Sequence, residues 1–570
     1  MHKLDARARG CERDQKKTGI TLEMAACLPC EVSTDATPPA FFFSRGRGTF
    51  VVERPLPVAA RKKLVAKMAD QGAVCGVIML RGGKSLCRND TDHEELFRQE
   101  SYFAHLFGVQ EPDCWGIIEL PAGRATLLVP KLDASYAVWM GEIKSCSQFQ
   151  RRYFVDACAY TDALPAVLKQ TLESSPGPVH VLSGTNSDSG ADLFVTLPVL
   201  PVGSALPPGA SFDKTMLYEA AAECRVAKSA EEIELMRYVS WVSSAAHASV
   251  MRDTRPGMYE YQLEALFLFH CAYHGGCRHA AYTCICACGP NSAVLHYGHA
   301  GAPNDRELRE KDMALLDMGC EYMCYASDIT CSFPVSGTFS ADQRMIYETV
   351  LDAQRQIFAM MRPGVAWQDM HRLMWRVTLT HLRAADLLVG DVDDMLAANL
   401  GAVFIPSGLG HLIGIDTHDV GGYLTHTPAR SSLPGLSKLR TSRILEPGMV
   451  LTVEPGCYFI DALLDSALAD PTLAQFLVPE ALERFRGFGG VRLEDVVAIT
   501  DTSIDNLTTC PRTVTEVEAV MRGGEWPPQT DAAPWLMRRW TTLDRATGRM
   551  VPDDRIRVET GAGLDLDADF

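Results

Sequence analysis

Two aspartates near the middle of the chain combine a residue type and a spacing that suit metal binding. Asp317 closes an apolar run, and Asp328 opens the next one eleven residues later. The glycine-containing segment 319–326 between them is turn-like, so the flanking runs can pair as antiparallel strands and bring both carboxylates together. Two carboxylates at that distance repel each other unless a cation lies between them. On their own, the two residues fit surface or capping aspartates equally well.

Three more polar residues lie in the same kind of apolar setting. Glu454 follows one strand-like run, Glu494 lies within another, and His411 lies in a glycine-rich apolar segment. A single histidine of this kind is more often a hydrogen-bonded core residue than a ligand, but four carboxylates buried without partners would be costly together. An oxygen-rich donor set with one imidazole suits manganese or cobalt, and zinc less well. The combination favours a metal centre.

Folded domains must position these side chains, and the length and composition of the chain are sufficient to form such domains. The chain has 570 residues, a length that suggests about two to four domains. Its 47% hydrophobic and 22% charged residues are typical of a globular protein whose cores need no disulfides. The net charge of −17 argues against general binding to nucleic acid or to anionic membranes, which favour a positive surface. No apolar run reaches the length of about 18 residues that a membrane span needs, so none is expected.

The cysteines indicate a reducing compartment. There are 19 of them, an odd number, and residues 1–17 lack the apolar core of a signal peptide. We therefore expect reduced thiols and a cytoplasmic protein. Cys284, Cys286 and Cys288 alternate, so on a strand they would face one side as small apolar residues. Zinc binding is the weaker alternative, because no Cys-x-x-Cys pair accompanies them.

The hydrophobic pattern divides the chain into two folded domains, an extension and a tail. Residues 1–48 have no clear period and are expected to be a disordered N-terminal extension. Residues 49–222 alternate helical and strand-like segments, as in an α/β domain. Residues 223–525 have α+β patterning and contain every strong chemical feature. Residues 526–570 begin near a Pro-Pro pair, end in an acidic run, and are expected to form a loosely attached C-terminal tail.

Individual elements can be placed within these domains. Capping boxes at Ser229 and Ser340, each with a glutamate or glutamine three residues later, begin two helices with apolar stripes. The pattern also predicts a helix at 59–69, a hairpin of strands 116–120 and 125–130, and further strands at 73–80, 179–182, 314–318, 329–334, 449–453 and 491–499.

Seven ordered segments resemble the Xaa-Pro dipeptidases (prolidases), a group of the pita-bread metallopeptidases, family M24. The likeness extends over about residues 49–520, and the order of the motifs makes it specific where any one alone would not be. It implies a pita-bread catalytic domain of α+β class, preceded by a smaller, creatinase-like α/β domain. The segments are 295–305 (LHYGHAGAPND), 316–319 (LDMG), 327–334 (SDITCSFP), 408–411 (GLGH), 416–423 (DTHDVGGY), 452–456 (TVEPG) and 491–494 (VRLE).

The resemblance implies a pair of metal ions, two Mn²⁺ per subunit, with cobalt or zinc as alternatives. Asp328 and Glu494 would bridge the two ions, Asp317 would bind one, and His411 with Glu454 would bind the other. Such a pair polarises the scissile carbonyl and lowers the pKa of a bridging water, so that hydroxide is present near neutral pH. Glu454 is the candidate that accepts the water's proton and passes it to the leaving nitrogen.

The resemblance also assigns the substrate side of the site. His296 and His418 match family histidines that contact the substrate or the tetrahedral intermediate, and Tyr282 would line the pocket. Arg440 matches the arginine that binds the substrate's carboxylate, for which a guanidinium fork is suited. Arg492 would orient the neighbouring glutamate ligand. Without the flanking motifs, an exposed arginine and a core tyrosine would be the simpler interpretations of Arg440 and Tyr282.

The chain departs from the family pattern at two places. Ser407 stands where the family usually has a histidine, and a serine hydroxyl can donate a hydrogen bond but is shorter and uncharged near neutral pH. We expect Ser407 to line the substrate site and to weaken catalysis or change substrate preference, with the metal site intact. The second departure is that Asp495 follows Glu494 directly, whereas prolidases commonly have two glutamates before that aspartate. Glu494 remains the expected ligand.

The leading hypothesis is a metallopeptidase that hydrolyses Xaa-Pro dipeptides. The bond before proline is a tertiary amide without an N–H, so a dedicated site is needed. An aminopeptidase P-like enzyme acting on longer peptides is the first alternative. The second alternative is a family member with weakened catalysis or with binding alone, which Ser407 keeps open. All five expected metal ligands are present, which argues against this alternative and against the metal-free creatinases. The resemblance implies a homodimer, and no nucleic-acid or membrane partner is expected.

Overall fold

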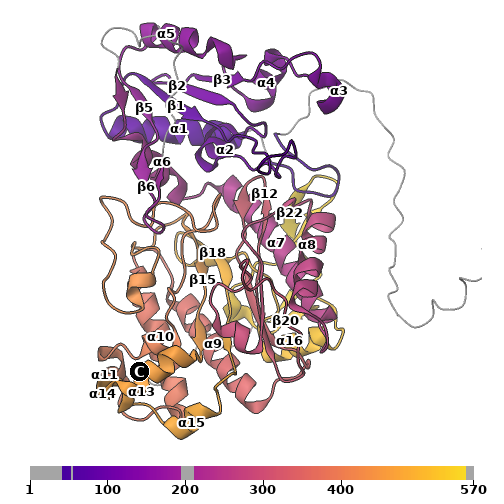
Figure 1. Ribbon diagram of the computed structural model, residues 1–570, viewed down its shortest axis with the longest axis vertical. Coiled ribbons are helices and arrows are strands. Elements are labelled where there is room, and N and C mark those ends of the chain that lie inside the picture. Colours follow the sequence, from indigo (N-terminus) through magenta and orange to yellow (C-terminus); the bar gives the residue numbers. More distant parts are fainter. Residues whose placement is uncertain (1–41, 53–54, 194–210, 560–570) are drawn as a thin grey trace, which may run out of the picture. The chain divides into compact units, whose positions relative to one another are not determined.

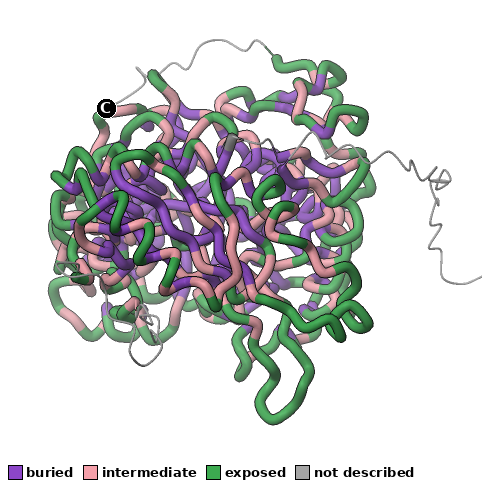
Figure 2. The backbone as a smooth tube through the Cα atoms, turned by 90° about the horizontal axis from the view of Figure 1, so that it is seen from above, coloured by how far each residue is buried: buried purple, intermediate pink, exposed green. Residues whose placement is uncertain are grey.

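The computed structural model of the chain describes residues 42–52, 55–193 and 211–559 (Figure 1). Most of the expected N-terminal extension, residues 1–41, and the end of the expected tail, residues 560–570, lie outside the described residues. Buried segments form the interior, and exposed segments form the outer turns and helix faces (Figure 2). No helix in the described part is long and apolar enough to cross a membrane.

Residues 55–226, here called the N-terminal region, are built on a six-stranded mixed sheet. The order of its strands is β4-β3-β2-β1-β5-β8. The elements are α1 (Pro55–Asp70), β1 (Val77–Arg81), α2 (Ser101–Phe107), β2 (Trp115–Glu119), β3 (Ala125–Val129), α3 (Tyr136–Met140), α4 (Cys146–Tyr153), β4 (Ala157–Tyr160), α5 (Leu164–Ser174), β5 (Val179–Val181), β6 (Gly184–Thr185), β7 (Asp192–Leu193), β8 (Phe212–Asp213) and α6 (Leu217–Val226).

Both faces of this sheet are covered because side chains alternate along each strand. Val77 and Met79 of β1 pack with Leu168 of α5 in one core. Ile78 and Leu80 lie in the other core, which α1 and α2 share. The predicted hairpin is confirmed, since β2 and β3 pair in antiparallel register. The strand predicted at 73–80 starts only at β1, because Gly76 has a φ of 89°, outside the extended range.

Residues 230–558, here called the C-terminal region, contain long helices and several small sheets (Figure 1). The helices are α7 (Ala230–Asp253), α8 (Glu260–Gly275), α9 (Ala341–Met360), α10 (Trp367–Ala384), α11 (Val392–Ala397), α12 (Gly401–Phe404), α13 (Asp461–Ala469), α14 (Pro471–Ala474), α15 (Pro479–Glu483) and α16 (Val514–Met521). The strands are β9 (His279–Ala280), β10 (Ile285–Cys288), β11 (Met313–Asp317), β12 (Cys320–Tyr322), β13 (Tyr325–Ala326), β14 (Thr330–Pro334), β15 (Val450–Val453), β16 (Gly456–Tyr458), β17 (Gly490–Arg492), β18 (Asp495–Ile499), β19 (Ile504–Asn506), β20 (Thr530–Asp531), β21 (Thr541–Asp544), β22 (Arg549–Pro552) and β23 (Arg557–Val558).

The two predicted capping boxes begin α7 and α9. The Ser229 hydroxyl accepts the backbone N–H of Glu232, and the Glu232 carboxylate accepts that of Ser229. Ser340 and Gln343 make the same reciprocal pair at α9. Each box satisfies backbone donors that a helix start leaves free, so local hydrogen bonding determines where these two helices begin.

The acidic residues of interest lie where strands end. β11 pairs antiparallel with β14 and places Asp317 opposite Thr330, so the predicted antiparallel pairing is confirmed. Asp328 lies two residues before the start of β14, at the same edge as Asp317. Glu454 lies between β15 and β16.

The single strand predicted at 491–499 is wrong. The segment forms two strands instead: β17 pairs with β16, and β18 pairs with β15. Glu494 lies in the break where the chain changes partner. A hydrophobic pattern cannot show this break, because β17 and β18 are buried throughout.

Both chain ends of the described part are better packed than expected. Leu536 is fully buried, and Trp540 is 7% exposed. Arg538 is buried and donates to Glu516 of α16 at 2.7 Å. Residues 526–559 are therefore not a loosely attached tail, because they bury aromatic and ionic contacts. Likewise Phe42 is buried, so residues 42–48 do not continue a disordered extension.

The described cysteines are all free thiols. Cys286 and Cys288 lie on β10, with Cys284 just before it, and all three are buried in one core. The intervening Ile285 and Ala287 belong to a different cluster. The predicted packing of the alternating cysteines on one side is therefore confirmed.

Candidate active site

All the residues expected at the site line one cavity of about 1030 Å³. Its walls come mainly from the C-terminal region, but the turn between β6 and β7 of the N-terminal region also contributes. The expected residues along it are Tyr282, His296, Asp317, Asp328, Ser407, His411, His418, Arg440, Glu454, Arg492 and Glu494. The fold thus gathers side chains that are widely separated in the sequence.

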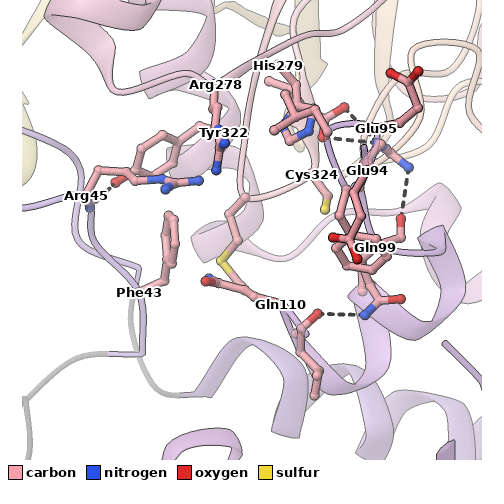
Figure 3. Close-up of a pocket in the computed structure, with 18 of the residues that line it drawn as sticks. Phe43, Arg45, Glu94, Glu95, Gln99, Gln110, Arg278, His279, Tyr322 and Cys324 are labelled. Carbon is pink, nitrogen blue, oxygen red and sulfur yellow. Dashed lines mark hydrogen bonds and ion pairs between the residues drawn. The ribbon is translucent and has the colours of Figure 1, made fainter. Parts of the chain in front are cut away.

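A second cavity, of about 760 Å³, contains none of these residues. Figure 3 shows Phe43 and Arg45 on one side of it and Glu94 and Gln99 on the other. Its walls mix basic, acidic and aromatic side chains, and the cluster of possible metal ligands found among the described residues lies in the larger cavity. We therefore place the candidate active site in the larger cavity.

Three of the expected ligands form a tight buried cluster. Ligand atoms of Asp328, His411 and Glu494 all lie within 4.8 Å of one another. His411 Nε2 lies 3.3 Å from Asp328 Oδ2 and 3.7 Å from Glu454 Oε1. One imidazole therefore faces three carboxylates.

Asp317 is held from two sides. Tyr282 donates its hydroxyl to Asp317 Oδ1 at 2.6 Å, and Arg492 Nη2 donates to Oδ2 at 2.6 Å. Arg492 Nε is 3.9 Å from Glu494, so the short contact of Arg492 is with Asp317 rather than with the glutamate expected from the sequence. The short bond to Glu494 comes from the Thr330 hydroxyl, at 2.6 Å. Thr330 was missed because a threonine in an apolar strand carries no distinguishing pattern.

The backbone fixes the tautomer of His411. Its Nδ1 lies 3.0 Å from the carbonyl oxygen of Leu412, and because a carbonyl only accepts, Nδ1 carries the hydrogen. In the neutral ring Nε2 then has the lone pair, and a cation held between it and the carboxylates of Asp328 and Glu454 would accept that lone pair. A ligating imidazole is commonly oriented in this way by a hydrogen bond from its other nitrogen.

The buried carboxylates destabilise one another's charged forms. Burial, followed by the charge of Asp328, raises the pKa of Asp317 to about 6. Burial is also the largest cause that raises the pKa of Glu454 to about 7 and that of Glu494 well above its ordinary value. Burial alone would lower the pKa of His411, but its hydrogen bond with Asp328 and the charge of Glu454 raise it. A cation would neutralise such a cluster.

The donor set fits divalent cations. Carboxylate oxygens with one imidazole nitrogen suit manganese and cobalt and can also hold zinc. Asp328 Oδ1 is buried and has no hydrogen-bond partner among the described residues. A buried acceptor without a partner costs free energy, and a bound cation would satisfy it. This free oxygen supports Asp328 as a ligand.

Comparison with known proteins agrees with the two regions and with the site described above. The family model for Metallopeptidase family M24 matches residues 234–501, and the model for the Aminopeptidase P, N-terminal domain, matches residues 58–180. The Xaa-Pro dipeptidase of Homo sapiens is 49% identical over 498 residues, which cover 86% of this chain and 97% of that protein. The chain belongs to metallopeptidase family M24. It is therefore a metallopeptidase.

Other relatives support the same architecture. A probable Xaa-Pro aminopeptidase of Pyricularia oryzae is 36% identical and covers 82% of this chain and 96% of its own length. The solved structure of zinc-substituted Escherichia coli aminopeptidase P in complex with product is 29% identical, with a TM-score of 0.67 over 83% of this chain and 99% of that one. The predicted fold, a pita-bread domain after a smaller creatinase-like domain, is confirmed.

Two imidazoles of this M24 metallopeptidase line the cavity beside the acidic cluster. The ring of His418 packs edge-on against His411, with 4.5 Å between ring centroids. Burial, followed by the charge of His411, lowers the pKa of His418 to about 3. Burial, followed by the charges of Arg440 and Arg492, lowers the pKa of His296. Both rings are therefore neutral near pH 7 and can donate one N–H to a substrate oxygen.

Arg440 lies at the rim of the cavity, where its side chain is 28% exposed. Its only ion pair in the described part of the chain is with Asp188, at 3.2 Å. Asp188 comes from the turn between β6 and β7 in the N-terminal region. The sequence did not indicate Asp188 or its second partner Arg430, because a single aspartate in a polar turn is ordinary.

Ser407, the departure from the family pattern, lines the cavity with a free hydroxyl. Its Oγ is buried and has no hydrogen-bond partner among the described residues. The hydroxyl is thus available to a water or a substrate atom. Its contact with the substrate stays a prediction.

Proposed function

We propose that this M24 metallopeptidase hydrolyses Xaa-Pro dipeptides. The observation that carries the proposal is the convergence, in one cavity, of four buried ligand side chains and the half-buried Glu454, with Arg440 at the rim. The identity of 49% to a human Xaa-Pro dipeptidase supports the same substrate class. Our proposed metal ligands are Asp317, Asp328, His411, Glu454 and Glu494.

The residues of the chain have separable roles in this reaction. Arg440 binds the carboxylate of the dipeptide, and neutral His296 and His418 donate to the carbonyl oxygen that becomes negative in the transition state. Glu454 takes a proton from water and delivers it to the proline nitrogen as the bond breaks. Tyr282 and Arg492 hold Asp317 in place.

The proposed cofactor is a pair of Mn²⁺ ions, with cobalt or zinc as substitutes. When bound, divalent cations polarise the scissile carbonyl and lower the pKa of water. Asp317, Asp328, His411, Glu454 and Glu494 would together hold the ions, through carboxylate oxygens and one imidazole nitrogen. The free oxygen of Asp328 supports its place among these ligands.

Two further properties belong to the proposal. The reduced thiols of the described residues support a reducing, cytoplasmic compartment. The family resemblance supports a homodimer. Gel filtration with light scattering would test the dimer, and a subunit mass at all concentrations would contradict it.

Hydrolysis of Gly-Pro is expected to require a divalent cation. The purified chain should cleave Gly-Pro after addition of Mn²⁺ and should lose that activity after chelation, because the buried acidic cluster needs cations to be neutralised and to act. Release of proline measures the reaction. Absence of cleavage with Mn²⁺, Co²⁺ and Zn²⁺ would favour a non-catalytic member of the family.

A second candidate is an aminopeptidase P-like enzyme, since Escherichia coli aminopeptidase P is among the solved structures that the chain resembles. The same assay with Gly-Pro, Gly-Pro-Gly and Gly-Pro-Gly-Gly separates the two. A dipeptidase loses activity when the carboxylate that Arg440 binds is moved further along the chain. Higher kcat/KM for the longer peptides would assign the second candidate.

Substituting Ser407 by histidine is expected to raise kcat/KM for Gly-Pro. An imidazole reaches further than a hydroxyl and can donate a stronger contact to substrate, so an increase of about three- to tenfold is expected. Ser407→Ala provides the control, since it removes the hydroxyl without adding a ring. Equal rates for the natural chain and Ser407→His, at equal metal content, would contradict a role for this position.

A further inference from the structure

The turn between β6 and β7 brings a carboxylate from the N-terminal region to the rim of the cavity. Asn186 Oδ1 accepts the backbone N–H groups of Asp188 and Ser189, at 3.0 and 2.9 Å, so the turn has a defined conformation. Ser187 and Asp188 both line the cavity beside Arg440. They are the part of the N-terminal region that lines it.

Arg430 connects this turn to the segment that carries Arg440. Its Nη1 donates to the carbonyl of Leu439 at 2.6 Å, and its Nη2 donates to the carbonyl of Ser187 at 3.1 Å. The guanidinium also lies over the ring of Tyr423, 4.2 Å from the centroid. Arg430 is therefore fixed by backbone groups on both sides of the contact.

Asp188 lies between two arginines. Its Oδ1 accepts from Arg430 Nη2 at 2.5 Å, and its Oδ2 lies 3.2 Å from Arg440 Nη1. The Asp188 side chain is 18% exposed, so its charge is partly shielded from water. Because Arg430 is fixed by the backbone, it holds Asp188 in turn, and Asp188 holds one edge of the Arg440 guanidinium.

The remaining N–H groups of Arg440 are left for a ligand. A guanidinium carries five N–H donors, and Asp188 is the only group in the described residues with which its side chain makes an ion pair. Arg430, Arg440 and Asp188 together carry a net charge of +1, and Lys438 also lines the cavity, so a carboxylate is favoured here. The charge of Asp188 repels a second carboxylate from its own edge, so the ligand is directed to the other edge.

We propose that Asp188 is a positioning and specificity-determining residue, which orients Arg440 for the carboxylate of the dipeptide and closes that end of the cavity to peptides that continue beyond proline. The inference rests on the proposed function. A third residue would need space beyond Arg440, and Ser187 and Asp188 line the cavity beside that arginine. The N-terminal region thereby sets the length of the substrate.

Asp188→Ala tests this directly. The KM for Gly-Pro should rise about tenfold, because one charge-assisted contact that orients Arg440 is lost. The kcat should change less than about twofold, since no reacting atom is touched. The ratio of kcat/KM for Gly-Pro-Gly to that for Gly-Pro should increase by more than about tenfold, as both the wall and the orienting group are removed.

Two variants make the comparison specific. Asp188→Asn keeps an oxygen that can accept from one arginine, so its KM should lie between those of the natural chain and Asp188→Ala. Asp192→Asn changes an aspartate of the same hairpin whose bond is to Thr185 and not to either arginine, so its kinetics should be unchanged. A thermal unfolding curve for each variant separates positioning from loss of fold.

The outcomes distinguish this inference from the proposed function. Failure of the natural chain to cleave Gly-Pro would overturn both. Normal cleavage by the natural chain, with the same KM and the same length preference in Asp188→Ala, would overturn only the role of Asp188. A lower KM in Asp188→Ala would show that Asp188 competes with the substrate for Arg440, and would equally overturn the positioning role.

Discussion

Asp328→Asn is expected to abolish Gly-Pro hydrolysis, with a loss of at least about 10³-fold in kcat, because several kcal/mol of transition-state stabilisation depend on the cations. Asp328 is buried and faces His411 within 3.3 Å. Its Oδ1 has no protein partner among the described residues. An amide is neutral and offers a single acceptor oxygen, so it would hold a cation more weakly and would not balance its charge.

Metal content and thermal unfolding measure the same change without relying on activity. The natural chain should unfold at a higher temperature with Mn²⁺ than with a chelator, because ligands that bind only the folded state stabilise it. In Asp328→Asn this difference should shrink, and less than one equivalent of tightly bound metal should remain. Full metal content with a normal thermal shift would contradict the assignment of Asp328 as a ligand.

Asp312→Asn is the matched control. Asp312 is also a buried aspartate next to β11, but it pairs with Arg306 at 2.6 Å and does not line the cavity. The variant should unfold at a lower temperature, because a partly buried ion pair is broken. Its metal content and its response to Mn²⁺ should be retained. Loss of metal in both variants would point to unfolding rather than to ligand removal.

The sequence was informative where local chemistry determines structure. The capping boxes at Ser229 and Ser340 begin helices as predicted, since their hydrogen bonds are made within four residues. The placement of acidic residues against apolar runs identified the cluster, because unpaired buried charge is costly and rarely accidental. Asp317 and Asp328 meet because their strands pair antiparallel, which the turn-like segment between them already favoured.

The sequence was uninformative where the decisive contact joins distant segments. Asp188 meets Arg440 only because the N-terminal region packs beside the cavity, and no local pattern encodes that contact. The break at Glu494 depends on two partner strands that lie elsewhere in the chain. The packing of Leu536 and Trp540 was also missed, because a Pro-Pro pair and an acidic end resemble a tail whatever the intervening residues bury.

Glu454→Gln is expected to lower kcat for Gly-Pro by about 10²- to 10⁴-fold with a smaller effect on KM, the range typical for loss of a general acid–base group. Glu454 lies 3.7 Å from His411, directly after β15, and its side chain is 17% exposed. An amide retains an oxygen for the metal but cannot accept or deliver a proton near neutral pH. The variant therefore separates proton transfer from metal binding at one side chain.

Steady-state kinetics and metal content, measured on the same preparation, decide between the two roles. Glu446→Gln serves as control, since Glu446 is an exposed glutamate of the same region outside the cavity. Retained metal with a large loss of kcat would assign the proton transfer to Glu454. Loss of metal in step with activity would restrict Glu454 to the ligand set, and retained metal with near-normal kcat would exclude it as the proton carrier. Since burial raises the pKa of Glu454 to about 7, the first outcome is the one that the geometry and electrostatics of the site favour together.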